Sequence, residues 1–388
     1  MFHRMPRAAA GVALALVLAG CSSSSVTPSA STPTVTPAPT LAPTPTPTTA
    51  AVATPTSAAT PTTAPSAACA GAFTGSVVVI PKNTNNAYFD IAYKGIQQAA
   101  CDLGGTVTEV GPSSADATLQ IPFIQTATTQ GAKAIIVSAD DANAVAPALK
   151  AAMAAGIKVV GVDSSPAVGA YNVFVNQADT AGIGAGLADM ACDEAPSCTG
   201  EIAVLSATQT ATNQNAWIAA MQDTLKGTKY AGLKWDGVYY GNDDPQISTS
   251  QATAMLAAHP NLKVIISPTT VGIVAAAQVI TSQNKVGQVF VTGLGFPKSM
   301  QTFVKSGVAP EFALWNVSDL GYLAYATAVG LVNGTIKGNE GETFSVPSLP
   351  ELNAGQPYTI IKDNVVVLGP PFQFNKDNID AMSILFGM

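Results

Sequence analysis

Residues 77–110 read VVVIPKNTNNAYFDIAYKGIQQAACDLGGTVTEV. The run at 77–80 has the length and β-branching of a buried parallel strand, and residues 89–103 follow with helical spacing. Residues 107–110 then form a second strand. A strand, a helix and another strand in succession are typical of a parallel sheet covered by helices, so this stretch predicts an α/β fold.

The same alternation continues through two series of elements. The first series adds helices at 117–130 and 143–155 and strands at 134–137 and 159–162. The second series begins after a strand at 173–175 and contains helices at 180–191, 214–226, 245–258 and 272–282 and strands at 201–205, 233–239, 264–266 and 288–292. Two doubly wound, Rossmann-like lobes are expected.

The remaining segments predict how the two lobes are connected. Residues 312–314 form a strand leaving the second lobe, and the amphipathic segment 320–332 returns to the first. We expect extended structure at 359–368 and 372–374 to complete the second lobe. The N-terminal lobe then comprises 73–175 plus 317–345 and the C-terminal lobe 176–316 plus 346–388, joined by a multi-strand hinge.

Composition argues for a neutral ligand. The 388-residue chain has a formal charge of -7 and a pI near 4.8, and only 11% of its residues are charged. Nucleic-acid binding requires clustered Lys and Arg, so no nucleic-acid partner is expected. Beyond the N-terminus, no apolar stretch reaches the roughly 18 residues that span a bilayer.

The N-terminus has the features of an export signal. Residues 1–20 place basic side chains before a short apolar run, and the segment ends in Leu18-Ala19-Gly20-Cys21, which resembles a bacterial lipobox. We expect Cys21 to carry lipid and to anchor the protein to the outer face of the cytoplasmic membrane. The alternative is an ordinary secretory signal with a chance cysteine. Residues 21–72 are rich in Ser, Thr and Pro, which predicts an extended tether.

The other four cysteines form an even set in an oxidising compartment. Cys192 and Cys198 flank a short connection and are expected to pair, and Cys69 can join the entering chain to the first helix at Cys101. Zinc is the alternative partner for cysteines. Only His3 and His259 are available as histidine ligands and no C-x-x-C occurs, so no metal site is expected.

Polar residues follow the predicted strands. Ligands of open α/β sheets bind beyond the carboxyl ends of the strands, and two facing lobes enclose a cleft there. Amides, carboxylates and hydroxyls dominate these positions, which suits a sugar because its hydroxyls donate and accept hydrogen bonds. These positions include Lys82, Asn86, Tyr88, Phe89, Asp163, Asn213, Gln214, Pro268, Thr269, Thr270 and Leu294, which we take as the candidate ligand-binding residues together with the family resemblance given below; Trp315 lies at the crossing between the lobes.

Each candidate also has a purely structural interpretation. Lys82 can be a solvated lysine, Asp163 can cap a turn, and Asn213 with Gln214 can begin a helix. Trp315 is as consistent with a hinge or core position as with ligand contact. Asp243 is expected to take part in a turn and Trp217 to pack in the core, so neither is assigned to the site.

From residue 75 onward the chain resembles the type I periplasmic sugar-binding proteins of the ribose-binding group. The opening NNAYFDIAYKGIQQAACDLG is similar to that of the group, in which an Asn and two aromatic residues touch the sugar. Here those residues are Asn86, Tyr88 and Phe89. The resemblance implies the type I periplasmic binding protein fold and a monomeric receptor without a cofactor.

Several longer motifs resemble the binding components of rhamnose importers. They are VLSATQTATNQNAWI, VYYGNDDPQIS, SPTTVGIVAAAQVI, GQVFVTGLGFP, FALWNVSDLGYLA and GPPFQFNKDNI. The related autoinducer-2 receptors share Lys82, Asp163, Gln214 and Pro268 as implied ligand contacts. Their pattern, however, has Asp at position 213 and Ala at position 270. These differences favour L-rhamnose over the autoinducer, with another deoxysugar or polyol as a further alternative.

The resemblance implies a receptor that delivers its ligand to an ABC permease. An enzyme, such as a glycoside hydrolase using Asp140, Asp141 or Asp163, is the rival class. The sequence has no G-x-S-x-G motif, no glycine-rich phosphate loop and no plausible catalytic histidine. No enzymatic activity is therefore expected. The sequence does not separate transport from sensing.

Overall fold

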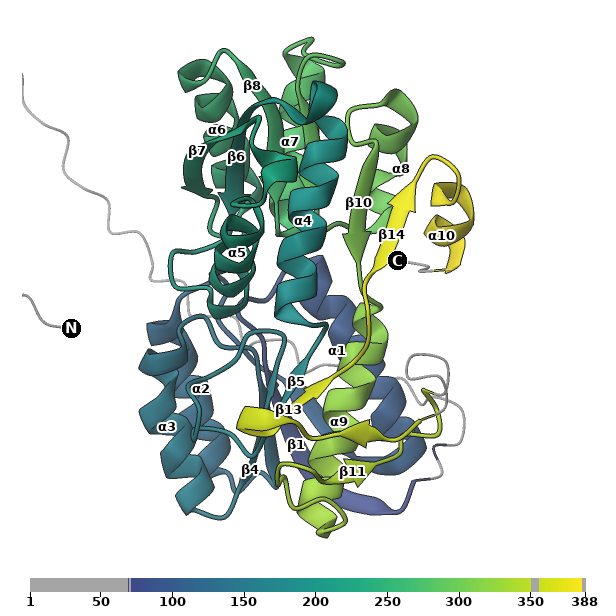
Figure 1. The fold of residues 1–388 in the computed structure, drawn as a ribbon. Helices are drawn as coiled ribbons and strands as arrows, with labels where there is room; N and C mark the ends of the chain where they lie inside the picture. Colours follow the sequence, from purple (N-terminus) through teal and green to yellow (C-terminus); the bar gives the residue numbers. More distant parts are fainter. Residues whose placement is uncertain (1–68, 70, 350–355, 386–388) are drawn as a thin grey trace, which may run out of the picture. The chain divides into compact units, whose positions relative to one another are not determined.

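Two parallel β-sheets organise the chain (Figure 1). The structure, a computed structural model, describes Cys69 and residues 71–349 and 356–385, which all belong to one compact unit. The expected export signal, Cys21 and nearly all of the expected tether lie outside the described residues. Within the described part, none of the helices combines the length and apolar character needed to cross a membrane.

The N-terminal lobe is built on a six-stranded parallel sheet. Its strands are β1 (Phe73–Ile80), β2 (Gly104–Glu109), β3 (Ala134–Val137), β4 (Lys158–Val162), β5 (Val173–Asn176) and β13 (Val365–Val367). They follow the order β13-β5-β4-β3-β1-β2. The central strands β3 and β4 are almost wholly buried, which explains their continuous apolar sequences.

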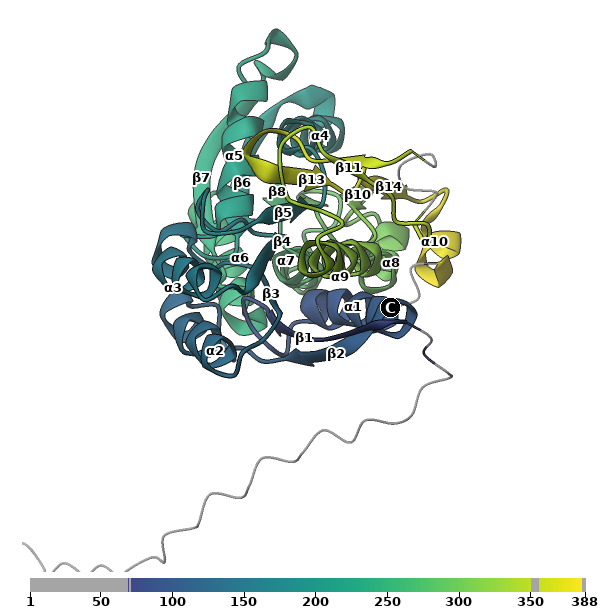
Figure 2. The same cartoon turned by 90° about the horizontal axis from the view of Figure 1, so that it is seen from below.

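Four helices cover the two faces of this sheet. They are α1 (Ala87–Leu103), α2 (Ala117–Thr129), α3 (Ala142–Ala154) and α9 (Val317–Asn333). Figure 2 shows α2 and α3 on one face and α1 and α9 on the other. Helices α1 and α9 approach closely at glycines: a Cβ atom on Gly95 would overlap the backbone of Ser318, and one on Gly321 would overlap that of Ala92.

The C-terminal lobe has a four-stranded parallel sheet in the order β7-β6-β8-β9. The bounds of these strands are β6 Gly200–Ser206, β7 Leu233–Tyr240, β8 Leu262–Ser267 and β9 Phe290–Gly293. A parallel bridge from Leu294 to Ala313 leads to β10 (Glu311–Leu314), which pairs with β14 (Phe372–Asn375) in antiparallel fashion. The helices are α4 (Thr180–Glu194), α5 (Thr212–Thr224), α6 (Pro245–Ala258), α7 (Thr270–Ser282), α8 (Pro297–Ser306) and α10 (Ile379–Leu385).

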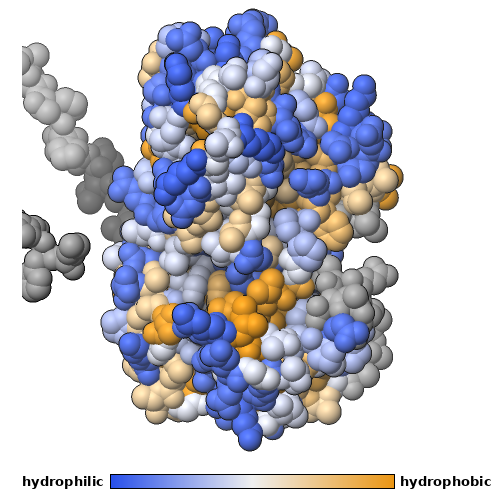
Figure 3. All heavy atoms as spheres, in the orientation of Figure 1, coloured by the Kyte–Doolittle hydropathy of each residue, from blue (hydrophilic) through white to orange (hydrophobic). Residues whose placement is uncertain are grey.

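The C-terminal tail corrects the expected division of the lobes. Residues 346–388 were expected to complete the C-terminal lobe, but β13 pairs with β5 and extends the N-terminal sheet. Val366 is fully buried there, so the three consecutive valines of β13 supply an apolar edge strand. Figure 3 shows hydrophobic residues gathered on this face of the N-terminal lobe, in the region of β13. The chain then crosses back, and β14 joins the C-terminal lobe.

Short elements complete the chain. The two-stranded pair β11 (Thr343–Phe344) and β12 (Tyr358–Thr359) precedes β13. The described residues also include 3-10 turns at Pro196–Cys198, Thr228–Tyr230 and Lys362–Asn364. With the elements assigned to the lobes as above, the described chain passes between the lobes three times: from β5 to α4, from β10 to α9 and from β13 to β14.

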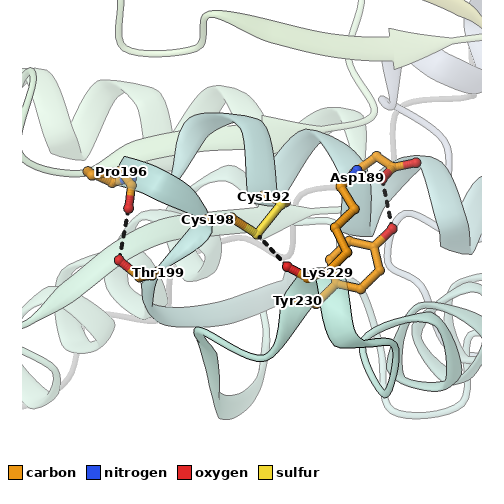
Figure 4. The surroundings of a disulfide bond; sticks show 7 residues. All are labelled: Asp189, Cys192, Pro196, Cys198, Thr199, Lys229 and Tyr230. Carbon is orange, nitrogen blue, oxygen red and sulfur yellow. Dashed lines mark hydrogen bonds and ion pairs between the residues drawn. A yellow bond between two sulfur atoms is a disulfide. The ribbon is translucent and has the colours of Figure 1, made fainter.

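Both cysteine pairs expected from the sequence are joined in the structure. Cys69 bonds Cys101 of α1, and Cys192 bonds Cys198 across the end of α4. Figure 4 shows the second disulfide beside Lys229, whose carbonyl oxygen lies 3.5 Å from Cys198 Sγ. Asp189 of α4 accepts hydrogen bonds from Lys229 Nζ and, at 2.7 Å, from Tyr230 Oη. These contacts fix the segment after α5 against α4.

Candidate functional site

A cavity lies between the carboxyl ends of the two sheets. The empty space between its lining atoms is about 360 Å³. All twelve residues proposed from the sequence line it. They are Lys82, Asn86, Tyr88, Phe89, Asp163, Asn213, Gln214, Pro268, Thr269, Thr270, Leu294 and Trp315.

Asp163 stands at the centre of the polar wall. It follows β4 directly and has a φ of 62°, a left-handed conformation that is uncommon for a residue with a side chain. Its carboxylate accepts hydrogen bonds from Ser138 Oγ at 2.8 Å, Gln177 Nε2 at 3.3 Å and Asn213 Nδ2 at 3.1 Å. Asp163 is 4% exposed, and these bonds hold its carboxylate in place.

Lys82 and Asn213 complete a polar bridge between the lobes. Lys82 follows β1 in the N-terminal lobe, and its Nζ donates to Asn213 Oδ1 of α5 in the C-terminal lobe at 3.1 Å. Lys82 Nζ also lies 3.7 Å from Asp163 Oδ2. Lys82 is 2% exposed, and its ammonium group lies between an amide oxygen and a carboxylate. A buried charge is tolerated when it is paired in this way.

The C-terminal lobe contributes side chains from the starts of α5 and α7. Gln214 Oε1 accepts from Ser206 Oγ at 2.7 Å and from the Ala207 amide at 2.8 Å, which holds the side chain at the end of β6. Thr269 is the N-cap of α7 and donates from Oγ1 to Asp243 Oδ1 at 2.5 Å. Asn213 and Gln214 do not cap α5, because its N-cap is Ala211.

Aromatic rings form the apolar wall of the cavity. Tyr88 and Phe89 pack edge to face with ring centroids 5.3 Å apart, and Trp315 Nε1 donates to Tyr88 Oη at 2.9 Å. Trp217 lies 5.7 Å from Trp315, centroid to centroid. Burial, followed by the charge of Asp163, raises the pKa of Tyr88 well above its usual value. The phenol therefore stays protonated as a hydrogen-bond donor.

Sequence reasoning left three lining residues outside the site: Trp217, Asp243 and Leu314. Trp217 was expected in the core, and it is 2% exposed, but its ring also borders the cavity. Asp243 was expected in a turn, and it does adopt a left-handed φ of 51° there. That turn aims Asp243 toward Thr269. The motif GNDDP could have identified Asp243 as a lining residue, because paired acids after a strand can face a cleft as well as begin a helix.

Asp140 lies close to the cavity without lining it. It follows β3 and is 1% exposed, and neither carboxylate oxygen has a hydrogen-bond partner. Burial raises the pKa of Asp140 to about 8, an effect that Lys82 opposes and Asp243 reinforces. The pKa of the Asp140 carboxyl therefore depends on one charged residue from each lobe, Lys82 and Asp243.

The arrangement matches a known class of protein. A family model described as a periplasmic binding protein domain matches residues 77–336. The chain belongs to the periplasmic binding protein family, the extracytoplasmic solute-binding proteins of ABC transporters. This membership confirms the two-lobed α/β fold expected from the sequence.

Individual relatives cover most of the chain. An ABC transporter solute-binding protein from Clostridium phytofermentas with bound L-rhamnose is 40% identical, with a TM-score of 0.78, over 81% of this chain and 99% of that one. LsrB from Clostridium saccharobutylicum in complex with AI-2 is 26% identical, with a TM-score of 0.72, over 79% and 99%. A D-ribose/D-allose-binding protein from Pseudomonas aeruginosa is 24% identical over 61% of this chain and 77% of its own length.

Proposed function

We propose that the protein captures L-rhamnose in the cavity between its lobes and delivers it to the permease of an ABC importer. The observation that carries this proposal is the set of buried hydrogen-bonding groups around Asp163, which faces the aromatic wall of Tyr88, Phe89 and Trp315. A deoxysugar has hydroxyls for the polar side and an apolar methyl group and ring face for the aromatic side.

The relative with bound L-rhamnose supports the choice of ligand, because it is 40% identical over nearly its whole length. Asn213 and Thr270 support it as well, since they differ from the autoinducer-2 receptor pattern. Lys82, Asp163 and Asn213 are the polar ligand contacts in this account. A buried polar group left unpaired costs about 1–3 kcal/mol, so isomers that misplace a hydroxyl bind more weakly.

Autoinducer-2 is the second candidate ligand. LsrB, solved in complex with AI-2, is 26% identical to this chain, and Lys82, Asp163, Gln214 and Pro268 all line the cavity. A receptor for autoinducer-2 or for another deoxysugar or polyol would use the same closure. It could serve sensing in place of uptake.

Capture requires the lobes to close around the ligand. The ligand first contacts one lobe and then the other, and its greater affinity for the closed state shifts the population toward closure. The three chain crossings form the hinge. In the same account Cys21 carries the lipid anchor, residues 21–72 form the tether, and the monomeric body works at the outer face of the cytoplasmic membrane.

The test of the proposed site is the exchange Asp163→Asn. It removes a carboxylate that accepts several hydrogen bonds, and losing a charged partner costs about 1.5–3 kcal/mol, or roughly a 10- to 150-fold loss of affinity. Asp141→Asn is the matched control, because Asp141 caps α3 and does not line the cavity. Calorimetry with L-rhamnose should show the loss in the first variant only. Equal affinity of the wild type, Asp163→Asn and Asp141→Asn for L-rhamnose would contradict the proposed binding site.

A further inference from the structure

Three side chains with metal-binding atoms meet in the C-terminal lobe, far from the cavity. One oxygen each from Glu201 and Asp236 and one ring nitrogen of His259 lie within 4.8 Å of one another. Glu201 is the second residue of β6, whose other end contacts Gln214. At about 3.3 Å per residue, this cluster lies on the order of 17 Å from the cavity end of the strand.

The local backbone brings these groups together from three elements. Strands β6 and β7 are parallel neighbours, and their register shifts between Ile202 and Val204. In β7 the shift coincides with Gly237, whose φ of 121° suits glycine. This irregularity lets Asp236 and Tyr239 both reach His259, the residue that ends α6.

The imidazole of His259 is held in a defined orientation. Its Nε2 lies 2.7 Å from Tyr239 Oη, and its Nδ1 lies 3.4 Å from Asp236 Oδ2. Metal-binding histidines commonly use one ring nitrogen for a hydrogen bond that fixes the ring and the other for the metal. Nδ1 faces the carboxylate of Asp236, and in the tautomer that carries its proton on Nε2, donated to Tyr239, the lone pair of Nδ1 is available for a metal.

In the part of the chain that the structure describes, His259 is the one cationic partner of these two carboxylates, and it is charged only when its imidazole is protonated. Among the described residues, no lysine forms an ion pair with Glu201 or Asp236, and Asp236 Oδ2 is buried without a hydrogen-bond partner. Two neighbouring carboxylates repel one another unless a positive charge lies between them. A divalent cation would supply that charge and satisfy the buried oxygen.

We propose that Glu201, Asp236 and His259 form a binding site for a divalent transition-metal ion of the zinc type. Carboxylate oxygen and imidazole nitrogen are ordinary zinc ligands, and three protein ligands leave a position for water. The site joins β6, β7 and α6, which lie together in Figure 1. Because it is remote from the cavity, its role is to stabilise the C-terminal lobe, since an ion that binds only the folded state raises stability.

The test exploits the scarcity of histidine in this chain. His3 and His259 are the only two, so the exchange His3→Gln makes His259 the sole imidazole in a full-length protein purified without a histidine tag. Calorimetric titration of this metal-free protein with zinc chloride should show one bound ion per chain. The melting temperature should rise with zinc concentration.

Three further exchanges in that background assign the ligands. His259→Gln and Asp236→Asn should each weaken zinc binding at least tenfold, while circular dichroism remains unchanged. Asp223→Asn is the matched control, because Asp223 is an exposed acid of α5 that pairs only with Lys226. Zinc binding that survives His259→Gln, or that is as weak as adventitious surface binding, would overturn the proposal. So would a melting temperature that falls equally with His259→Gln in the presence of zinc or of a chelator.

Discussion

Lys82 Nζ and Asn213 Oδ1 lie 3.1 Å apart although 131 positions separate the two residues in sequence. One belongs to each lobe, and both border the cavity. The same asparagine donates to Asp163 at 3.1 Å, so a single amide side chain links the C-terminal lobe to a cation and an anion of the N-terminal lobe. In the proposed account, closure of the lobes therefore completes the ligand site.

Asn213→Ala should weaken the binding of L-rhamnose because it removes this bridge. Hydrogen bonds to charged groups contribute about 1.5–3 kcal/mol, so the dissociation constant is expected to rise roughly 10- to 150-fold. Calorimetry measures the change. Asn215→Ala is the control on the same helix, since Asn215 is half-buried, lies outside the cavity lining and donates to the Gln209 carbonyl. Similar affinities for both variants would argue against the bridge.

Asp140 should make the stability of the protein depend on pH. Its pKa is raised by burial from an ordinary 3.8 to about 8, so between these values the folded state holds a proton that the unfolded state releases. Stability then falls as the pH rises from about 4 to about 8 and levels off above that. Asp140→Asn removes this dependence.

Thermal unfolding at several pH values measures the Asp140 effect. The melting temperature of Asp140→Asn minus that of the wild type should grow from pH 5 to pH 8. All other titrating groups are common to both proteins, so the difference isolates Asp140. A difference that stays constant with pH would show that this carboxyl does not bind the extra proton.

Gly321→Ala should destabilise the N-terminal lobe by about 1–3 kcal/mol, because the added methyl group would overlap the backbone of Ala92 where α1 and α9 meet. Gly186→Ala is the matched control in α4, where a Cβ meets no atom within 4 Å. In a helix interior that exchange is expected to stabilise by up to about 1 kcal/mol. Chemical denaturation gives both values, and equal effects would refute the close contact.

Much of this architecture is readable from the sequence. The buried parallel strands are unbroken β-branched runs, and the polar residues after them necessarily gather at one edge of each sheet. These strand ends, together with the family resemblance, gave the twelve proposed residues that line one cavity, including Asp163 after β4 and Thr269 before α7. The short connection predicted the pair Cys192–Cys198, and the even count left Cys69 and Cys101 as a possible second pair; both are bonded.

Other features depend on tertiary contacts that local patterns do not encode. The valines of β13 gave an extended segment, but only pairing with β5 decides which lobe they join. Helix α8 was missed, although Pro297 at its start and Gly307 after its end are typical helix signals. Trp217 is both a core residue and part of the cavity wall, and its spacing predicts only the first role.

The most direct test of the central claim is calorimetric titration of the purified protein with L-rhamnose, its stereoisomers and autoinducer-2. The account predicts that L-rhamnose binds one-to-one and at least tenfold more tightly than its stereoisomers or autoinducer-2. Absence of L-rhamnose binding, or tighter binding of autoinducer-2, would contradict it.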